Sequence, residues 1–307
     1  MDGVGGSRPQ DGPAAAAPNF PAMTTLRLGG VPEHFNLPIH LAAERGAFAS
    51  RGVELEWTTF EGGTGQMTQA LRAGAIDACV LLTEGIVTDI LAGNPSKIIS
   101  VYVTTPLIWG VHTGVDNPLR HHGEVYDRRY AISRFGSGSH LMAIVDATAQ
   151  GRALRREQFE AVGNLDGALA SLAAGATDVF YWEKYTTKPY VDAGRLRRVG
   201  EFVTPWPCFV IAATDEVLAR APEAVIRMLR TIHDACDAFM QDDAAAVPLV
   251  AERYGQRRAD VERWYHATEW AIHGWVSDKM LRGVIHNLRV ANIVAKDQEV
   301  PELVWTR

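Results

Sequence analysis

Three glutamates follow three predicted strands, at positions where carboxylates could neutralise a cationic ligand. Glu33, Glu84 and Glu183 each come directly after such a strand. Ligands of an open parallel sheet meet the carboxyl ends of its strands, so the three side chains could converge on one cleft. A carboxylate removed from water without a partner is costly, which favours an amine-bearing or zwitterionic ligand. The alternative is a solvated rim, with Glu183, for instance, paired to Lys184 or Lys188.

The turn from Gly136 to His140 could bind an anion. Small residues let backbone N–H groups approach a ligand, and a helix that follows offers its N-terminal dipole. Ser137 and Ser139 flank Gly138 and add hydroxyl donors. The alternative is a plain N-cap at Ser139, as many helices have. We expect a helix to begin at about Ser139, with the N–H groups of the turn facing the cleft.

The strand-end rule selects further candidates for the ligand site. They are His34, Phe35 and Asn36 after the first strand, Gly63 and Thr64 after the second, Thr83 beside Glu84, and Trp182 beside Glu183. Aromatic side chains at such positions would suit a ring-bearing or apolar ligand body. His34 could also act as an acid–base group if Glu61 or Glu84 lay within hydrogen-bond reach.

No motif indicates a cofactor, a metal or a standard catalytic centre. The sequence has no GxSxG, Walker A, GxGxxG or HExxH at a fitting place. His121 and His122 are adjacent, so they face different ways and do not form a metal-binding pair. Cys79, Cys208 and Cys236 lie far apart, which disfavours a disulfide framework or a structural zinc site.

The elements that must position these residues alternate between strand and helix. Such alternation predicts βαβ units and a parallel sheet. From residue 215 onward the pattern is almost wholly helical, and we expect Trp264, Trp270 and Trp275 to pack on that helical stretch. The predicted strands are 26–31, 53–60, 76–82, 98–103, 130–132 and 176–181, and the predicted helices are 38–48, 64–73, 85–92, 140–150 and 166–174.

Two strand-like stretches, 104–112 and 202–212, are interrupted by prolines. If the chain leaves a first lobe through one and returns through the other, they form a hinge with a ligand between the lobes. This predicts residues 24–105 plus 208–307 as lobe 1 and 106–207 as lobe 2. The alternative is one doubly wound domain with prolines on its edge strands.

Composition is that of a globular chain. Of the 307 residues, 47% are hydrophobic and 21% charged, and the formal net charge of −6 with dispersed basic residues disfavours nucleic-acid binding. Residues 1–23 predict a disordered tail without the apolar core of a signal peptide, and no stretch is apolar enough for a membrane span. We therefore expect a cytoplasmic location for the chain as given. It would be periplasmic or on the cell surface if a signal has been trimmed.

Ordered motifs along residues 26–212 resemble type II periplasmic solute-binding proteins. The branch is that of alkanesulfonate-, nitrate- and thiamine-pyrimidine-binding proteins, and the most similar group lacks secretion signals. The resemblance implies a two-lobed α/β fold with two hinge strands and C-terminal helices, and it marks the same turns as ligand-facing. It rests on the runs 26–32, 38–48, 52–55, 62–63, 70–71 and 74–78, with 32–35, 63–68 and 82–85 for the group.

These observations predict a non-catalytic protein that binds a small organic solute by hinge closure. Its partner would be an ABC-transporter permease if it is exported, and a cytoplasmic form would be a carrier or sensor. The alternative is a cytoplasmic enzyme on the same scaffold. Futalosine-pathway dehydratases and fungal pyrimidine synthases resemble this fold, although the cysteine-rich motif of the latter is missing here.

Overall fold

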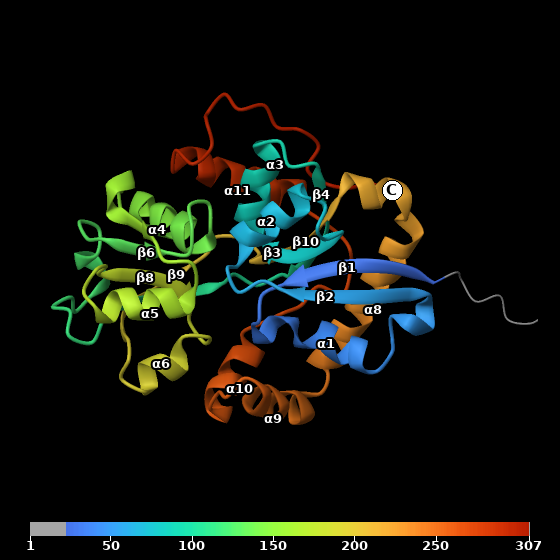
Figure 1. Cartoon of the computed structure of the whole chain (residues 1–307), viewed down its shortest axis with the longest axis horizontal. Coiled ribbons are helices and arrows are strands. Elements are labelled where there is room, and N and C mark those ends of the chain that lie inside the picture. The colour runs from blue at the N-terminus through green and yellow to red at the C-terminus, as the bar shows by residue number, and fades with distance from the viewer. Residues whose placement is uncertain (1–22, 307) are drawn as a thin grey trace, which may run out of the picture.

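Residues 23–306 of the computed structural model fold into two lobes, each built on a five-stranded sheet (Figure 1). The predicted tail lies outside these described residues apart from Met23. The prediction of a two-lobed α/β fold is therefore confirmed. A single doubly wound sheet is ruled out for the described chain, because no strand pairing joins the two sheets.

The sheet of lobe 1 has the strand order β2-β1-β3-β10-β4. β1 pairs in parallel with β2 and β3, whereas β10 runs antiparallel to β3 and β4. Every residue of β3 is buried, as expected for a strand covered on both faces. The strands are β1 (Thr24–Gly30), β2 (Val53–Thr59), β3 (Ala78–Leu82), β4 (Ser96–Val103) and β10 (Phe209–Thr214).

The sheet of lobe 2 has the order β7-β6-β8-β5-β9. β6 is parallel to β7 and β8, and β5 is antiparallel to β8 and β9. The strands are β5 (Ile108–Thr113), β6 (Tyr130–Ile132), β7 (Phe159–Ala161), β8 (Val179–Glu183) and β9 (Arg197–Val203).

The predicted parallel pairing is present in both sheets, but each sheet is mixed, because each contains a strand that enters directly from the other lobe. β5 and β10 are those strands, and they run against their neighbours. The stretch 202–212 is also not one strand, since β9 ends at Val203 and β10 begins at Phe209. Pro205 and Pro207 between them have no N–H for a sheet ladder. The lobes are thus joined by two short connections, 104–107 and 204–208.

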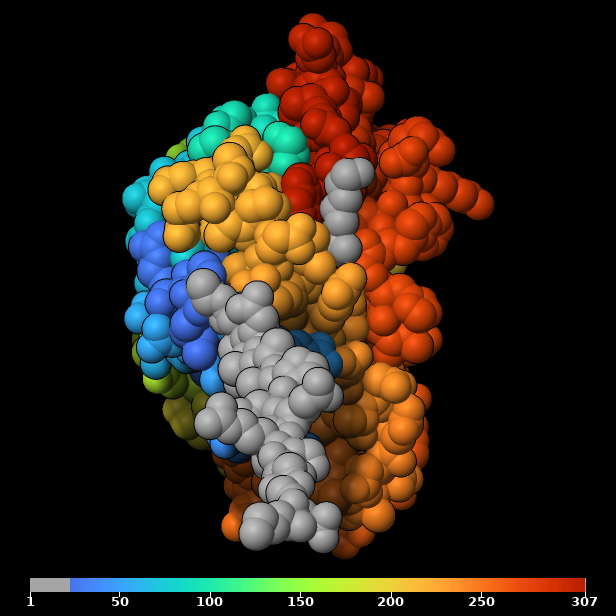
Figure 2. Space-filling view, turned by 90° about the vertical axis from the view of Figure 1, so that its right-hand side faces the viewer, coloured from blue at the N-terminus to red at the C-terminus, as the bar shows by residue number. Residues whose placement is uncertain are grey.

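Helices cover both faces of each sheet. α1 and α8 pack together on one side of lobe 1, α2, α3 and α11 lie on the other, and α4 and α5 flank the sheet of lobe 2 (Figure 1). On this face of the molecule, segments from the last third of the chain, coloured gold to red, lie beside the blue and teal segments of lobe 1 (Figure 2). None of the helices in the described part of the chain is long and apolar enough to cross a bilayer. The bounds are α1 (Leu37–Glu44), α2 (Thr64–Arg72), α3 (Thr83–Leu91), α4 (Gly138–Ala149), α5 (Leu165–Ala173), α6 (Lys188–Asp192), α7 (Asp215–Arg220), α8 (Pro222–Met240), α9 (Asp243–Arg253), α10 (Arg258–His266) and α11 (Asp278–Val290).

The three C-terminal tryptophans do not share one helical environment, which corrects the sequence-based expectation. Trp264 lies on α10 and is buried. Trp270 is buried on a non-helical segment that bridges to Val103 of β4. Trp275 is 73% exposed on the loop before α11.

Candidate functional site between the lobes

A small cavity of about 40 Å³ lies between the two lobes, where strand ends and helix N-termini from both sheets meet. Lobe 1 contributes the ends of β1 and β3 and the start of α2. Lobe 2 contributes the start of α4 and the end of β8. The lining residues are Val31, Glu33, Gly63, Thr64, Leu82, Leu107, Trp109, Ser133, Ser137, Gly138, Ser139, Trp182, Glu183 and Phe209.

An outer cavity of about 250 Å³ shares Val31, Glu33 and Trp182 with the inner one. It is also lined by Glu61 from lobe 1. Lobe 2 contributes the segment that starts α5, together with Thr186 and Tyr190. The two cavities form one cleft that narrows toward the connections between the lobes. Glu33 stands where they join, and it retains partial contact with solvent.

Two carboxylates from opposite lobes face this cleft. Burial, and next the neighbouring Glu183 carboxylate, raise the pKa of Glu33 from 4.5 to about 8, an effect that the nearby Trp182 indole partly offsets. Burial also raises the pKa of Glu183, although the backbone N–H of Thr186 donates to its Oε2 at 2.6 Å. Like charges close together in a dry site cannot both ionise easily. The pair would therefore favour a proton or a ligand cation between them.

The raised pKa of Glu33 predicts a loss of stability as pH rises. Between pH 4.5 and about 8 the folded chain holds a proton that the unfolded chain has lost, so the free energy of unfolding falls across this window. Glu33→Gln removes that dependence. We expect its melting temperature to equal the parent's at pH 5 and, since Glu33 keeps some solvent contact, to exceed it by about 5 °C at pH 9.

Scanning fluorimetry across pH measures this difference. Glu216→Gln, an exposed carboxylate at the start of α7, is the matched control and should follow the parent curve. Parallel curves for Glu33→Gln and the parent would contradict the prediction.

The N-terminus of α4 also lines the inner cavity, on the same lobe as Glu183. The helix begins at Gly138 with Ser137 as N-cap residue, one residue before the predicted start. Ser139 Oγ accepts from the N–H of Ser133 at 3.1 Å, and Ser137 Oγ donates to the carbonyl of Arg134 at 2.7 Å. Neither serine side chain caps the helix. Among the described residues the N–H groups of Gly138 and Ser139 have no hydrogen-bond partner, so they are available to an anionic group.

Gly138 is required for the close contact between this helix and lobe 1. A Cβ atom at this position would lie 2.3 Å from Leu82 Cδ1 and 2.7 Å from Trp109. The aromatic wall is itself fixed, since the indole N–H of Trp109 donates to Thr204 Oγ1 at 2.8 Å. Trp182 stacks on Phe180, with ring centroids 5.2 Å apart.

Several contacts hold the two lobes together around the cleft. Arg134 of lobe 2 donates from Nη1 to the carbonyl of Gly62 at 2.5 Å. Near the mouth, Asp192 of α6 pairs with Arg257 beside α10 at 2.7 Å, and Lys188 of α6 lies 3.5 Å from Asp260 of α10. The lobes are thus in a closed arrangement with ionic contacts across the opening.

The structure places His34, Phe35 and Asn36 beneath the cleft, away from its surface. His34 is 1% exposed, and its ring contacts Phe35 and Trp264. Burial lowers its pKa to about 3, and no carboxylate of residues 23–306 lies within hydrogen-bond distance, so the predicted acid–base role has no geometric support. Phe35 packs against Phe209, which lines the cavity, and Asn36 Nδ2 donates to the carbonyl of Val31 at 2.8 Å. These residues support the cleft from behind.

Glu84 and Thr83 are also set back from the cavity, because they tie α3 to the connections between the lobes. Glu84 is fully buried, and Oε2 accepts from the indole N–H of Trp206 at 2.9 Å. Its Oε1 has no partner among the described residues, and burial raises its pKa to about 7. Thr83 Oγ1 donates to the carbonyl of Pro207 at 2.7 Å. The predicted convergence of three acids is thus reduced to Glu33 and Glu183.

Sequence reasoning missed residues on both walls of the cleft. Asn164 and Asp166 follow β7 in the outer cavity, and the strand-end rule would have found them if β7 had been recognised. Leu82 and Phe209 lie within strands, where no local signal separates a cavity wall from core.

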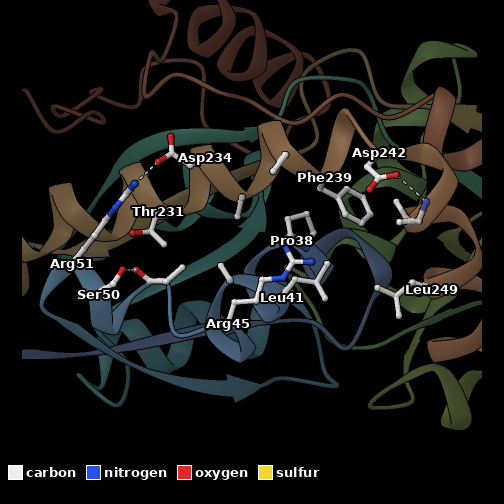
Figure 3. A pocket seen from close by; sticks show the side chains of 16 residues that line it. Pro38, Leu41, Arg45, Ser50, Arg51, Thr231, Asp234, Phe239, Asp242 and Leu249 are labelled. Atoms are coloured by element: carbon white, nitrogen blue, oxygen red, sulfur yellow. Dashed lines mark hydrogen bonds and ion pairs between the residues drawn. The ribbon is translucent and has the colours of Figure 1, made fainter.

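Another hollow, of about 300 Å³, lies on lobe 1 between α1, α8 and α9 (Figure 3). Three of its charged side chains are engaged within the protein: Arg51 pairs with Asp234 at 2.5 Å, and Asp242 caps α9 at the N–H of Ala245. It contains none of the predicted site residues. Among residues 23–306, no group of three or more His, Cys, Asp and Glu side chains is placed to hold a metal ion.

Comparison with known proteins agrees with this architecture. The computed structure matches the Candida albicans CA3427 gene product, described as defining a new family with the generic periplasmic-binding-protein fold, at 23% identity over 91% of this chain and 93% of that one, with a TM-score of 0.85. It matches the alkanesulfonate-binding protein SsuA from Xanthomonas axonopodis pv. citri bound to MOPS at 17% identity, over 93% of this chain and 99% of that one, with a TM-score of 0.77. It also matches the nitrate-binding protein NrtA from Synechocystis PCC 6803 at 16% identity, over 91% of this chain and 84% of that one, with a TM-score of 0.66. A sequence search of curated proteins finds no significant match.

The chain therefore has the periplasmic-binding-protein fold, which it shares with these alkanesulfonate- and nitrate-binding structures. More narrowly, the family model described as Ca3427-like PBP matches residues 109–202, which form most of lobe 2. The resemblance predicted from the sequence motifs is confirmed.

Proposed function

We propose that this protein binds one small organic solute in the cleft between its lobes, and that the solute carries an amine or another cationic group on an apolar or aromatic body. The observation that carries the proposal is the pairing of Glu33 with Glu183 across the cleft. Two carboxylates in a dry site need a cation or strong donors to remain ionised. The walls formed by Trp109, Trp182 and Phe209 suit a flat ring.

The N-terminus of α4 supports an additional anionic or acceptor group on the same solute. The free N–H groups of Gly138 and Ser139 belong to residues that line the same small inner cavity as the two carboxylates. A lone anion would meet Glu33 and Glu183 as well as these donors, and like charges repel at short range. A zwitterion with its amine toward the glutamates would satisfy both walls.

Thermal-shift screening tests this function, since a ligand that binds only the folded state raises the melting temperature. Amine-bearing heterocycles and amino-acid-like compounds should stabilise the protein more than simple sulfonates or nitrate. Native mass spectrometry of freshly purified protein should show a co-purified ligand of matching mass. The ligand assignment fails if simple sulfonates stabilise most.

The partner depends on the compartment. In an exported form the loaded protein would deliver its solute to an ABC-importer permease, and in a cytoplasmic form it would act as a carrier or sensor. We favour the cytoplasmic form, and cell fractionation followed by immunodetection separates the two. Detection only outside the cytoplasm would contradict that assignment.

A further inference from the structure

A second hollow lies behind the connections between the lobes, apart from the cleft. Its volume is about 600 Å³, a size typical of small-molecule sites. Thr104 belongs to one connection between the lobes and Pro205, Trp206 and Pro207 to the other, and all four line it. We call it the hinge hollow, and the remaining wall comes from Val101 of β4 and from segment 269–284.

The wall of the hinge hollow is aromatic and held in place from behind. Trp206 is anchored by its hydrogen bond to buried Glu84. The indole N–H of Trp270 donates to the carbonyl of Phe35 at 3.0 Å, and the N–H of Thr104 donates to the carbonyl of Glu269 at 2.8 Å. The part of the wall formed by Trp206, Trp270 and Thr104 is therefore preformed.

The mouth of the hollow exposes apolar surface that nothing in the described chain covers. Trp275 is 73% exposed and Ile272 is 42% exposed. Glu269 and Lys279 stand at the wall, and neither forms an ion pair with another described residue. One acceptor and one donor are thus free beside an aromatic floor.

We propose that the hinge hollow is a second ligand site, which binds a small planar molecule with an aromatic, largely apolar body and a polar substituent. Its concave shape and volume fit such a molecule. A protein partner would need roughly 20–30 residues of contact surface per side, far more than two exposed apolar side chains provide. The flat walls formed by Trp206, Trp270 and Trp275 favour ring stacking.

Titration with the fluorescent probe anilinonaphthalene sulfonate tests the proposal on the full-length protein. Gly283 lines the hollow on α11, and a Cβ added there meets no atom within 4 Å, so Gly283→Phe should place a ring at the wall and narrow the hollow without disturbing the helix. We expect one saturable site in the parent and an affinity at least about tenfold weaker in Gly283→Phe. Trp275→Ala, a truncation of an exposed side chain, should weaken binding about fivefold.

Two controls separate the hinge hollow from other surfaces. Arg282→Phe adds the same ring next to Gly283 on an exposed position that does not line the hollow, and Trp182→Ala alters only the cleft. Both should bind the probe within about twofold of the parent. Unchanged affinity in Gly283→Phe, or an equal loss in Arg282→Phe, would overturn the proposal. Light scattering could also overturn the proposal. If the parent is a dimer and Gly283→Phe is a monomer, the hollow is an interface between two copies of the chain.

Discussion

Replacing either cleft glutamate by glutamine is expected to weaken the binding of an amine-bearing solute at least about 100-fold. The substitution keeps the shape of the side chain and removes the charge, so a buried ligand cation loses its partner. Breaking such a pair costs about 2–5 kcal/mol. The measurement is calorimetric titration of Glu33→Gln and Glu183→Gln with the amine-bearing compound that stabilises the parent most.

The affinity of the parent should also depend on pH in a defined direction. Because the pKa of Glu33 is raised to about 8, the carboxyl is protonated below that pH and must release its proton when a cation binds. Affinity should therefore rise with pH up to about 8 and then level off. In Glu33→Gln this dependence should be lost.

Glu84→Gln is the matched control for this charge argument. Glu84 is also buried, but it does not line the cavity, and glutamine can still accept the hydrogen bond from Trp206. We expect its affinity to stay within about threefold of the parent's. A loss as large as that of Glu33→Gln would show that the charge effect is not local to the cleft.

Gly138→Val is expected to abolish solute binding while the lobes remain folded. A branched side chain at the start of α4 would overlap Leu82 across the cleft and Trp109 of its own lobe, because a Cβ alone already approaches both within 3 Å. The lobes can relieve the overlap with Leu82 by moving apart on their two connections, whereas the Trp109 ring has to shift within lobe 2. We expect binding to weaken at least about 100-fold and the radius of gyration in solution scattering to increase.

Gly123→Ala provides the control for a glycine substitution in the same lobe. Its Cβ would lie 3.3 Å from a flexible histidine side chain, so no rearrangement between the lobes is required. Affinity and radius of gyration should match the parent. If Gly138→Val binds as the parent does, the closed arrangement around Gly138 is not the binding arrangement.

Selecting residues that follow predicted strands identified some of the residues that line the cleft and also selected some that do not line it. The rule that ligands meet the ends of parallel strands selected Glu33, Ser137, Ser139 and Glu183, all of which line the inner cavity. The same rule selected His34, which the structure buries against Trp264. Adjacent residues after a strand point in different directions, and the sequence does not state which of them faces the ligand.

The three glutamates illustrate the same limit. Their spacing predicts one constellation, but Glu84 begins α3 and turns toward Trp206 of the connection between the lobes. That partner is 122 residues away in the chain. The contact follows from the antiparallel placement of β10 beside β3, and no local pattern specifies it.

The sequence by itself determined the alternation of strands and helices, the fully buried β3, the helical C-terminal part and the small turn that starts α4. These features depend on hydrophobic periodicity and on glycine and proline, which act over a few neighbouring residues. Only the tertiary structure decided that β5 and β10 run against their sheets, that Glu33 meets Glu183, and that an aromatic hollow lies behind the connections. Each of these arises where segments distant in the chain pack together, and packing between distant segments leaves no periodic signal in either one.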